Sequence, residues 1–325
     1  MRHIGPFEVA DVGLGCMNLS HAYGTPPTPE EGKRVIHRAI ELGVTHFDTA
    51  LLYGFGRNEF LVGEALEPYR RDVVLASKCG LGTADGKRII DGRPATILRT
   101  CKEALQRLRT DVIDLYYLHR WDKNVPIEDS VGALAQLVRA GAIRAIGLSE
   151  VSATTLRRAH AEHPIAAVQS EYSLWSRNVE IAVLDACREL NVSCVAFSPL
   201  GRGFLAGEVN PLAFGDKDLR RAMPRFQEPH FSKNLELLAG LRHLALEIGC
   251  TPAQLALAWL LHKSPIVVPI VGTTNVAHLE EDIAASKVKL SSELMLRLDA
   301  LINERTVSGP RYSDATQKEI DTEQF

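Results

Sequence analysis

Four titratable side chains stand where apolar, strand-like runs of the sequence stop. Asp48 ends the run VTHFD, Lys78 ends VVLASK and His119 ends VIDLYYLH. Tyr53 follows Asp48 in a short Gly-rich loop. In a parallel barrel, the carboxyl ends of the strands and the loops after them build the functional site. We therefore expect an acid, a phenol, an amine and an imidazole to meet on one rim.

This combination of groups is suited to general acid catalysis. A tyrosine has an ordinary pKa of about 10. A neighbouring ammonium should lower the pKa of Tyr53, and a carboxylate would hold that ammonium in place. The phenol then acts as a proton donor, while the imidazole of His119 donates a hydrogen bond that orients a carbonyl. Because the set contains no obvious nucleophile, the carbonyl would take hydride from a bound cofactor.

Three other site interpretations compete with this one. A Schiff-base aldolase would use Lys78 as its nucleophile, but it gives Tyr53 no role. The segment 80–86, GLGTADG, loosely resembles a Gly-rich dinucleotide loop, although its spacing is wrong and no helix pattern opens there. His160 and His163 lie three positions apart on a predicted helix, but no further ligands accompany them, so we predict no metal site.

The frame of the chain is a repeat of strand-like and helix-like segments. Eight apolar runs are each followed by a helical pattern, which predicts a (β/α)8 TIM barrel of one domain over residues 1–325. An open doubly wound sheet is the alternative. The runs are VGLGC (12–16), HFDT, VVLASK, VIDLYYLH, IRAIGLSE, AAVQSEY, SCVAFSPL and IVVPIVG (266–272).

Local capping signals support the helix predictions. The segment 28–43 should begin with Thr28 as N-cap, Pro29 in the first turn and Glu31 completing a capping box, and should end at Gly43. Two segments fall outside the repeat. A long loop follows the seventh strand at 201–233, and the polar tail at 304–325 either folds over the site or stays disordered.

Composition favours a protein that acts on small molecules. The chain has 325 residues, is 46% hydrophobic and 24% charged, and carries a formal net charge of -3. This balance argues against nucleic acid or an anionic membrane as the main partner. The six scattered cysteines and the lack of a leader-like or membrane-spanning apolar run predict reduced thiols in a cytoplasmic protein. The oligomeric state is left open.

Taken together, the motifs identify a family. GLGCMNLSHAYG, FDTALLYGFGRNE, ASK, DLYYLHR, GLSE, VQSEYSLW and AFSPLGRG all resemble aldo-keto reductase motifs, in the family's order. Within the family, the chain resembles the branch of auxin-induced-like and perakine-reductase-like enzymes. The resemblance implies NAD(P)H-dependent reduction of an aldehyde or ketone. It also implies a catalytic set of four residues, namely Asp48, Tyr53, Lys78 and His119.

The resemblance also implies where the nicotinamide nucleotide is held. Ser149 and Gln169 would bind the carboxamide, and Phe197 would stack on the nicotinamide ring. The remaining implied contacts are Gly15, Cys16 and Met17 on the floor of the site, Ser198, Leu200, Gly201 and Gly203 at the pyrophosphate, and Gly272, Thr273, Thr274, Asn275, His278 and Asp282 after the last strand. Tyr23 and Trp121 are the candidate substrate-pocket residues.

Two departures from the family pattern bear on the cofactor. Glu150 stands where many relatives have Asn, which leaves one carboxamide contact open. Relatives that prefer the phosphorylated cofactor usually carry Lys or Arg where this chain has Asn275 and His278, and Asn where it has Asp282. NADPH is the expected cofactor, while weaker pairing with its 2′-phosphate leaves NADH or dual use open. A non-catalytic nucleotide-sensing subunit on the same barrel is the alternative function, which the intact set of four disfavours.

Overall fold

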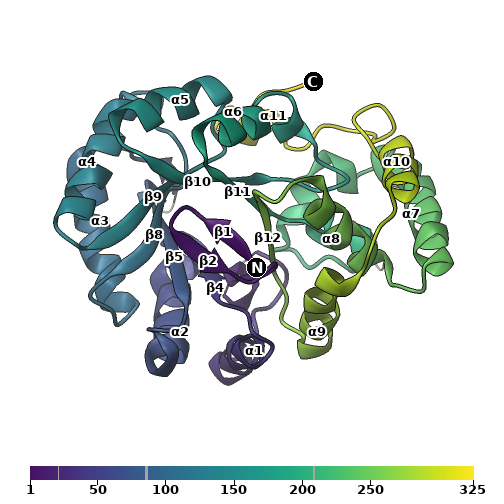
Figure 1. Cartoon of the computed structure of the whole chain (residues 1–325), viewed down its shortest axis with the longest axis horizontal. Helices are drawn as coiled ribbons and strands as arrows, with labels where there is room; N and C mark the ends of the chain where they lie inside the picture. The colour runs from purple at the N-terminus through teal and green to yellow at the C-terminus, as the bar shows by residue number, and fades with distance from the viewer. Residues whose placement is uncertain (21, 85–86, 208) are drawn as a thin grey trace.

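The fold is a closed parallel barrel, seen in a computed structural model that describes all residues except 21, 85, 86 and 208. Eight of the described strands form the barrel, in the order in which they follow one another along the chain. Figure 1 shows them ringed by helices. The barrel strands are β3 (Gly13–Gly15), β4 (His46–Asp48), β5 (Val74–Cys79), β8 (Ile113–Leu118), β9 (Ile143–Ser149), β10 (Ile165–Glu171), β11 (Ser193–Phe197) and β12 (Val267–Val271).

A helix follows each barrel strand and packs on the outside of the barrel. These helices are α1 (Pro29–Glu41), α2 (Arg57–Leu66), α3 (Pro94–Arg107), α4 (Ile127–Arg139), α5 (Ala153–Glu162), α6 (Val183–Leu190), α8 (Pro252–Lys263) and α9 (Val276–Ala284). Further helices are α7 (His230–Glu247), α10 (Ser292–Leu301) and the short α11 (Asp314–Gln317). The predicted (β/α)8 barrel is therefore confirmed, and each predicted strand run overlaps one barrel strand, with bounds that differ by a residue or more.

The local signals of the first helix are also confirmed. Thr28 caps α1, with its side chain accepting a hydrogen bond from the Glu31 amide, and Glu31 completes the capping box. Pro29 is the first residue of the helix, and Gly43 follows its end at a φ of 84°. A residue in this left-handed region ends a helix most easily when it has no Cβ. Sequence-local chemistry thus determines where the helix begins and ends.

The inside of the barrel is filled by its own layer of side chains. Leu115 and Tyr117 of β8 lie there, with smaller residues from neighbouring strands. A two-stranded hairpin, β1 (Arg2–Ile4) and β2 (Phe7–Val9), crosses one end of the barrel and is visible across its middle in Figure 1. Its Ile4 and Val9 are fully buried in the same inner core. The hairpin therefore closes the amino-terminal end, and the site must lie at the opposite end.

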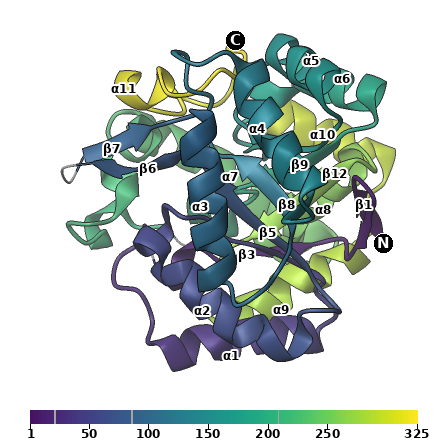
Figure 2. The ribbon, with the colours of Figure 1, turned by 90° about the vertical axis from the view of Figure 1, so that its left-hand side faces the viewer.

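The segments at the opposite end are irregular. A second hairpin, β6 (Leu81–Ala84) and β7 (Lys87–Ile90), projects there together with α11, away from the amino terminus (Figure 2). The loop after β11 and the connecting segments contain 3-10 turns, namely η1 (Met17–Leu19), η2 (Tyr53–Gly56), η3 (Glu67–Tyr69), η4 (Asn178–Glu180), η5 (Gly201–Ala206), η6 (Pro211–Ala213), η7 (Leu219–Ala222), η8 (Pro224–Phe226) and η9 (Ala285–Lys287).

Within the described residues, no single helix is both long and apolar enough to cross a bilayer. In the same part of the chain, one pair of helices, α7 and α8, reaches the required length and composition when taken together, but the two are bent by 84° relative to each other.

The inner core generates a prediction about stability. Gly147 of β9 pairs with Tyr117, and a Cβ added at Gly147 would lie 2.2 Å from Tyr117 Cδ1. Because the Tyr117 ring is fully buried, we expect Gly147→Ala to lower the free energy of unfolding by about 2 kcal/mol in urea denaturation. Gly132→Ala is the control, since the nearest atom lies 3.7 Å away and alanine favours a helix by up to about 1 kcal/mol. Equal stability of the two variants would contradict the tight contact.

Candidate active site

The four predicted residues meet at the carboxyl-terminal end of the barrel. Lys78 at the end of β5 is fully buried, and its ammonium donates to Asp48 Oδ1, to the Thr49 carbonyl at 2.9 Å and to Tyr53 Oη at 3.2 Å. The Lys78 ammonium has three N–H groups, so each can take one of these acceptors. His119 follows β8, and its ring meets the Tyr53 ring edge to face at a centroid distance of 5.9 Å. The acid, amine, phenol and imidazole are thus brought together as the sequence predicted.

A strained turn presents Tyr53 to this cluster. The three residues after it, Gly54, Phe55 and Gly56, all have positive φ, of 58°, 55° and 87°. A Cβ at Gly56 would lie 2.9 Å from Arg107 Cδ, so this position also lacks room for a side chain. Phe55 has a side chain but adopts a left-handed backbone conformation, which costs a non-glycine residue of order 1 kcal/mol or more. The tight turn lets Tyr53 point back to Lys78 only five residues after Asp48.

Burial changes the expected protonation behaviour of the phenol. From the sequence, we expect Lys78 to lower the pKa of Tyr53 below its ordinary value. In the structure, burial raises the pKa of Tyr53 by more than the neighbouring ammonium lowers it, so the expectation was wrong in its net direction. Burial lowers the pKa of Lys78, but the contacts with Asp48 and Tyr53 raise it by more. The pKa of Lys78 therefore lies above its ordinary value. A neutral phenol therefore faces a charged ammonium.

The imidazole is held neutral. Burial is the largest cause of the lowering of the His119 pKa, and the charges of Arg120, Lys78 and Arg88 lower it further, to well below its ordinary value. A neutral imidazole carries one N–H donor and one acceptor. Nδ1 of His119 is buried without a hydrogen-bond partner among the described residues. His119 can therefore serve as a neutral donor to a substrate oxygen.

A cavity of about 870 Å³ is lined by Asp48, Tyr53 and His119, while Lys78 lies buried and does not reach it. Its size lies within the range typical of small-molecule and cofactor sites. Most of the predicted cofactor and substrate residues line it, including Ser149, Gln169 and Phe197 near the catalytic groups. Gln169 Nε2 also donates to Asp48 Oδ2 at 2.8 Å. The other predicted residues that line the cavity are Gly15, Met17, Tyr23, Ser198, Leu200, Gly203, Gly272, Thr273, His278 and Asp282.

Some predicted residues lie outside the lining of the cavity. The Cys16 thiol is fully buried in the core between barrel and helices. Trp121 donates from Nε1 to the Val125 carbonyl and stacks against Arg158, so it is rim packing rather than a pocket wall. Gly201 packs near Trp175, and Thr274 and Asn275 are exposed, with Asn275 acting as the N-cap of α9.

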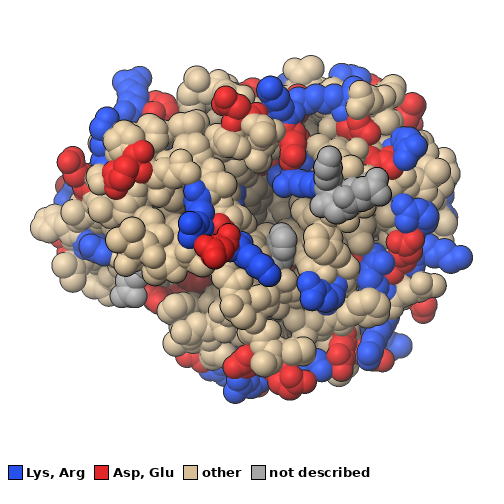
Figure 3. Space-filling view, turned by 180° about the vertical axis from the view of Figure 1, so that it is seen from behind, with Lys and Arg blue, Asp and Glu red and all other residues tan. Residues whose placement is uncertain are grey.

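The sequence reasoning missed four arginines that line the cavity. Arg88 comes from β7, Arg120 directly follows His119, and Arg202 and Arg220 come from the long loop after β11. Figure 3 shows the face opposite to that of Figure 1, with a central hollow and Lys and Arg side chains around it. The position of Arg120 next to a strand-ending histidine was the available signal, since residues at strand ends face the site.

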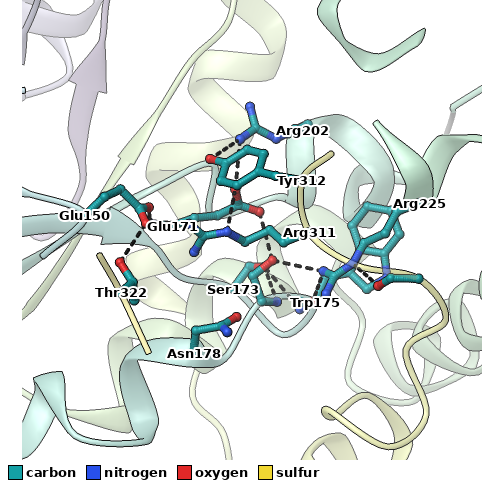
Figure 4. Close-up of polar contacts among 12 residues, drawn as sticks. Glu150, Glu171, Ser173, Trp175, Asn178, Arg202, Arg225, Arg311, Tyr312 and Thr322 are labelled. Atoms are coloured by element: carbon teal, nitrogen blue, oxygen red, sulfur yellow. Dashed lines mark hydrogen bonds and ion pairs between the residues drawn. The ribbon is translucent and has the colours of Figure 1, made fainter. Parts of the chain in front are cut away.

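Glu150 is turned away from the cavity and anchors the carboxyl-terminal tail. Its carboxylate pairs with Arg311, accepts from Thr322 Oγ1 at 2.7 Å and accepts from the Glu171 amide at 2.9 Å. Figure 4 shows this buried network continuing through Glu171 to Arg202. The Glu150 carboxylate is therefore held by the tail and by the Glu171 amide, and it does not line the cavity where the nicotinamide carboxamide is expected.

The tail itself folds over the site. Tyr312 accepts from Arg202 Nη2 at 2.9 Å, and Arg202 also pairs with Glu171 at 2.8 Å. Burial alone would raise the pKa of Glu171, but Arg202 and Arg311 lower it to about 2. Tyr312, Ser313 and Thr316 consequently form part of the cavity wall. Of the two expectations for residues 304–325, folding over the site is the one observed.

The competing site interpretations find no support in this geometry. Lys78 is a poor Schiff-base nucleophile here because its ammonium is paired and its pKa is raised. The segment after β5 forms the β6–β7 hairpin rather than a loop that opens a helix; its residues 85 and 86 lie outside the described part. His160 Nδ1 accepts from the Ile165 amide. No cluster of three potential metal ligands occurs among the described residues.

Comparisons with known proteins agree with the site. Residues 11–303 match the model of the Aldo/keto reductase family. A probable aldo-keto reductase 1 of Glycine max is 44% identical over 310 residues, covering 94% of this chain and 89% of that protein.

Solved structures show the same architecture. A glycerol dehydrogenase from Gluconobacter oxydans superimposes with a TM-score of 0.85 at 30% identity, over 95% of this chain and 96% of that one. An aldo/keto reductase from Klebsiella pneumoniae, solved with NADP and acetate, gives 0.72 at 26% identity, over 93% and 94%. With the family match spanning most of the sequence and the four groups assembled at the barrel end, this chain belongs to the aldo/keto reductase family.

Proposed function

We propose that this protein reduces an aldehyde or ketone to an alcohol with hydride from NADPH, and that Tyr53 is the general acid. The observation that carries the proposal is the Lys78 ammonium, which joins the Asp48 carboxylate to the Tyr53 hydroxyl at the wall of the cavity. A non-catalytic nucleotide sensor would not need a phenol held at 3.2 Å from a buried ammonium.

The proposed roles follow from the positions of the groups. A substrate carbonyl in the cavity would accept hydrogen bonds from the Tyr53 hydroxyl and from the neutral His119 ring. The nicotinamide, when bound, supplies hydride to the carbonyl carbon. As negative charge develops on the substrate oxygen, Tyr53 gives up its proton, and the Lys78 ammonium stabilises the phenolate that remains. Asp48 keeps the ammonium in place, because a buried cation needs a paired anion.

The donors that line the cavity, and its volume, suit a nicotinamide nucleotide. Ser149 and the Gln169 amide would hold the carboxamide, and the half-buried Phe197 ring would pack on the nicotinamide. Backbone around Ser198, Leu200 and Gly203 would contact the pyrophosphate. In this segment Ser198, Gly201, Arg202 and Gly203 all have positive φ, a turn geometry that can turn successive amides toward an anion.

NADPH is the proposed cofactor, and the Klebsiella pneumoniae relative was solved with NADP. The expected 2′-phosphate end has His278 and Asp282 in the cavity wall. Burial, with a smaller contribution from Glu281, raises the pKa of Asp282 to about 8. Below that pH the carboxyl group is neutral and does not repel the phosphate. NADH use or dual use is therefore expected to become more prominent as the pH rises.

The branch of the family and the cellular location are further parts of the proposal. Membership of the auxin-induced-like and perakine-reductase-like branch rests on the sequence motifs. A cytoplasmic location is supported by the cysteines: the structure describes all six, all are free, and five are buried.

The role of Tyr53 can be tested by removing only its hydroxyl. We expect Tyr53→Phe to lower kcat for a reactive aromatic aldehyde by about 100-fold or more, because the phenol is the proton donor. The dissociation constant for NADPH, followed by quenching of protein fluorescence, should change by less than about twofold. Tyr69→Phe, at a tyrosine 37% exposed outside the site, is the matched control. Parallel loss of nucleotide affinity and rate would contradict the role.

Cofactor preference should depend on pH through Asp282. Because its pKa is raised to about 8, the carboxylate charge appears as pH rises from 7 to 9 and repels the 2′-phosphate. We expect the ratio of KM for NADPH to KM for NADH to increase by about fivefold over this interval. Asp282→Asn should make the ratio independent of pH. A wild-type ratio that stays constant, or the same slope in both proteins, would show that Asp282 does not set the preference.

A further inference from the structure

The cavity contains one buried cation that the catalytic roles leave unexplained. Arg120 is only 7% exposed and lines the cavity next to His119. Its Nη1 donates to the His119 carbonyl at 2.6 Å and to Ser149 Oγ at 3.1 Å. Its Nε is buried without a hydrogen-bond partner among the described residues. The known contacts of Arg120 are therefore to neutral oxygens only.

The other cavity arginines differ from Arg120 in having carboxylate partners. Arg88 pairs with Glu319 at 2.6 Å, Arg202 with Glu171 at 2.8 Å and Arg220 with Asp218 at 2.7 Å. Within the described part of the chain, no carboxylate lies within 4 Å of Arg120. Burying a charged group without an opposite charge is unfavourable, so such a group in a binding site points to a ligand that supplies the charge.

Arg120 also lies close to the reacting groups. Burial is the largest cause of the lowered pKa of His119, and the charge of Arg120 lowers it further. For Tyr53, burial raises the pKa overall, and the charge of Arg120 is one of the smaller effects that oppose this rise. The cavity is also lined by the apolar side chains Leu52 and Leu81 and by Tyr312 of the tail, and Arg88 lies close enough to both Arg120 and Tyr312 for their charges to act on it. Arg120 directly follows His119, so a ligand bound to its guanidinium would lie beside the catalytic groups.

We propose that the substrate is an acidic carbonyl compound, and that Arg120 binds its carboxylate while the carbonyl lies between Tyr53 and His119. The proposal rests on the proposed reductase function and specifies its substrate class. A guanidinium can pair with a carboxylate through two parallel N–H groups. In Arg120, Nη2 makes no hydrogen bond within the described residues and is not enclosed by protein, so its N–H groups are the donors open to a ligand, while the unpartnered Nε is enclosed beside it. The other three arginines that line the cavity, Arg88, Arg202 and Arg220, are already paired with carboxylates of the protein.

The experiment compares acids with their neutral esters. The substrates are 2-, 3- and 4-carboxybenzaldehyde and the corresponding methyl esters, assayed with NADPH in wild type, Arg120→Gln, Arg120→Lys and Arg99→Gln. Arg99 is an exposed arginine of α3 outside the cavity, so its variant controls for the loss of one positive charge. The quantity compared is the ratio of kcat/KM for acid to ester, and the Kd of NADPH is measured for every protein.

For at least one positional isomer, we expect wild type to prefer the acid by about tenfold or more, as a charge-assisted pair predicts. Arg120→Gln should abolish this preference, Arg120→Lys should keep part of it, and Arg99→Gln should keep all of it. Ester reduction without any acid preference, a preference that survives in Arg120→Gln, or equal losses for acid and ester with weaker NADPH binding would overturn the proposal. The last result would assign Arg120 to positioning of the nucleotide.

Failure of the reductase function itself would look different. If neither acids nor esters were reduced with NADPH or NADH, calorimetry of benzoate and benzamide binding in the presence of NADP⁺ would test the anion site directly. Binding of benzoate but not benzamide, lost in Arg120→Gln, would support the site on a protein that is not a reductase. No benzoate binding would overturn it.

Discussion

The site depends on one buried ammonium. Lys78 has no exposed side-chain surface and is surrounded by the Asp48 carboxylate, the Thr49 carbonyl and the Tyr53 hydroxyl. An ammonium so far from water is stable only when its charge is paired and its N–H groups are all accepted. The arrangement therefore fixes the positions of three side chains at once, and the phenol is placed where its loss of a proton would be electrostatically supported.

The barrel makes this arrangement possible because parallel strands end on the same rim. Asp48 and Lys78 lie at the ends of neighbouring strands, β4 and β5, and His119 follows β8, which pairs with β5. Tyr53 reaches the same place through the turn of left-handed residues after it. The opposite end is closed by the β1–β2 hairpin, so the rigid inner core supports the site from below.

The arginines around the cavity are of two kinds: those that pair with a carboxylate of the protein, and Arg120, which does not within the described residues. The buried chain of contacts from Glu150 through Arg311, Glu171 and Arg202 to Tyr312 holds the tail as a wall of the substrate region. In that network every arginine has a carboxylate, and the tail is positioned by ion pairs that are sheltered from water. Arg120 stands apart from it, which is why an acidic substrate accounts for its charge better than a structural role does.

The sequence by itself determined the barrel and the four catalytic candidates. Alternating strand-like and helix-like runs give the eight units, capping residues such as Thr28 and Glu31 define helix ends, and residues at strand ends must share a rim. These features are local, so they can be read without knowing which distant segments meet.

Only the tertiary structure decided the environments of the residues. Burial outweighs Lys78 in setting the pKa of Tyr53, and Cys16 and Trp121 face away from the cavity. Glu150 pairs with Arg311, a residue 161 positions away, instead of lining the site. Desolvation and charge pairing depend on which atoms surround a group in space, and local sequence patterns do not contain that information.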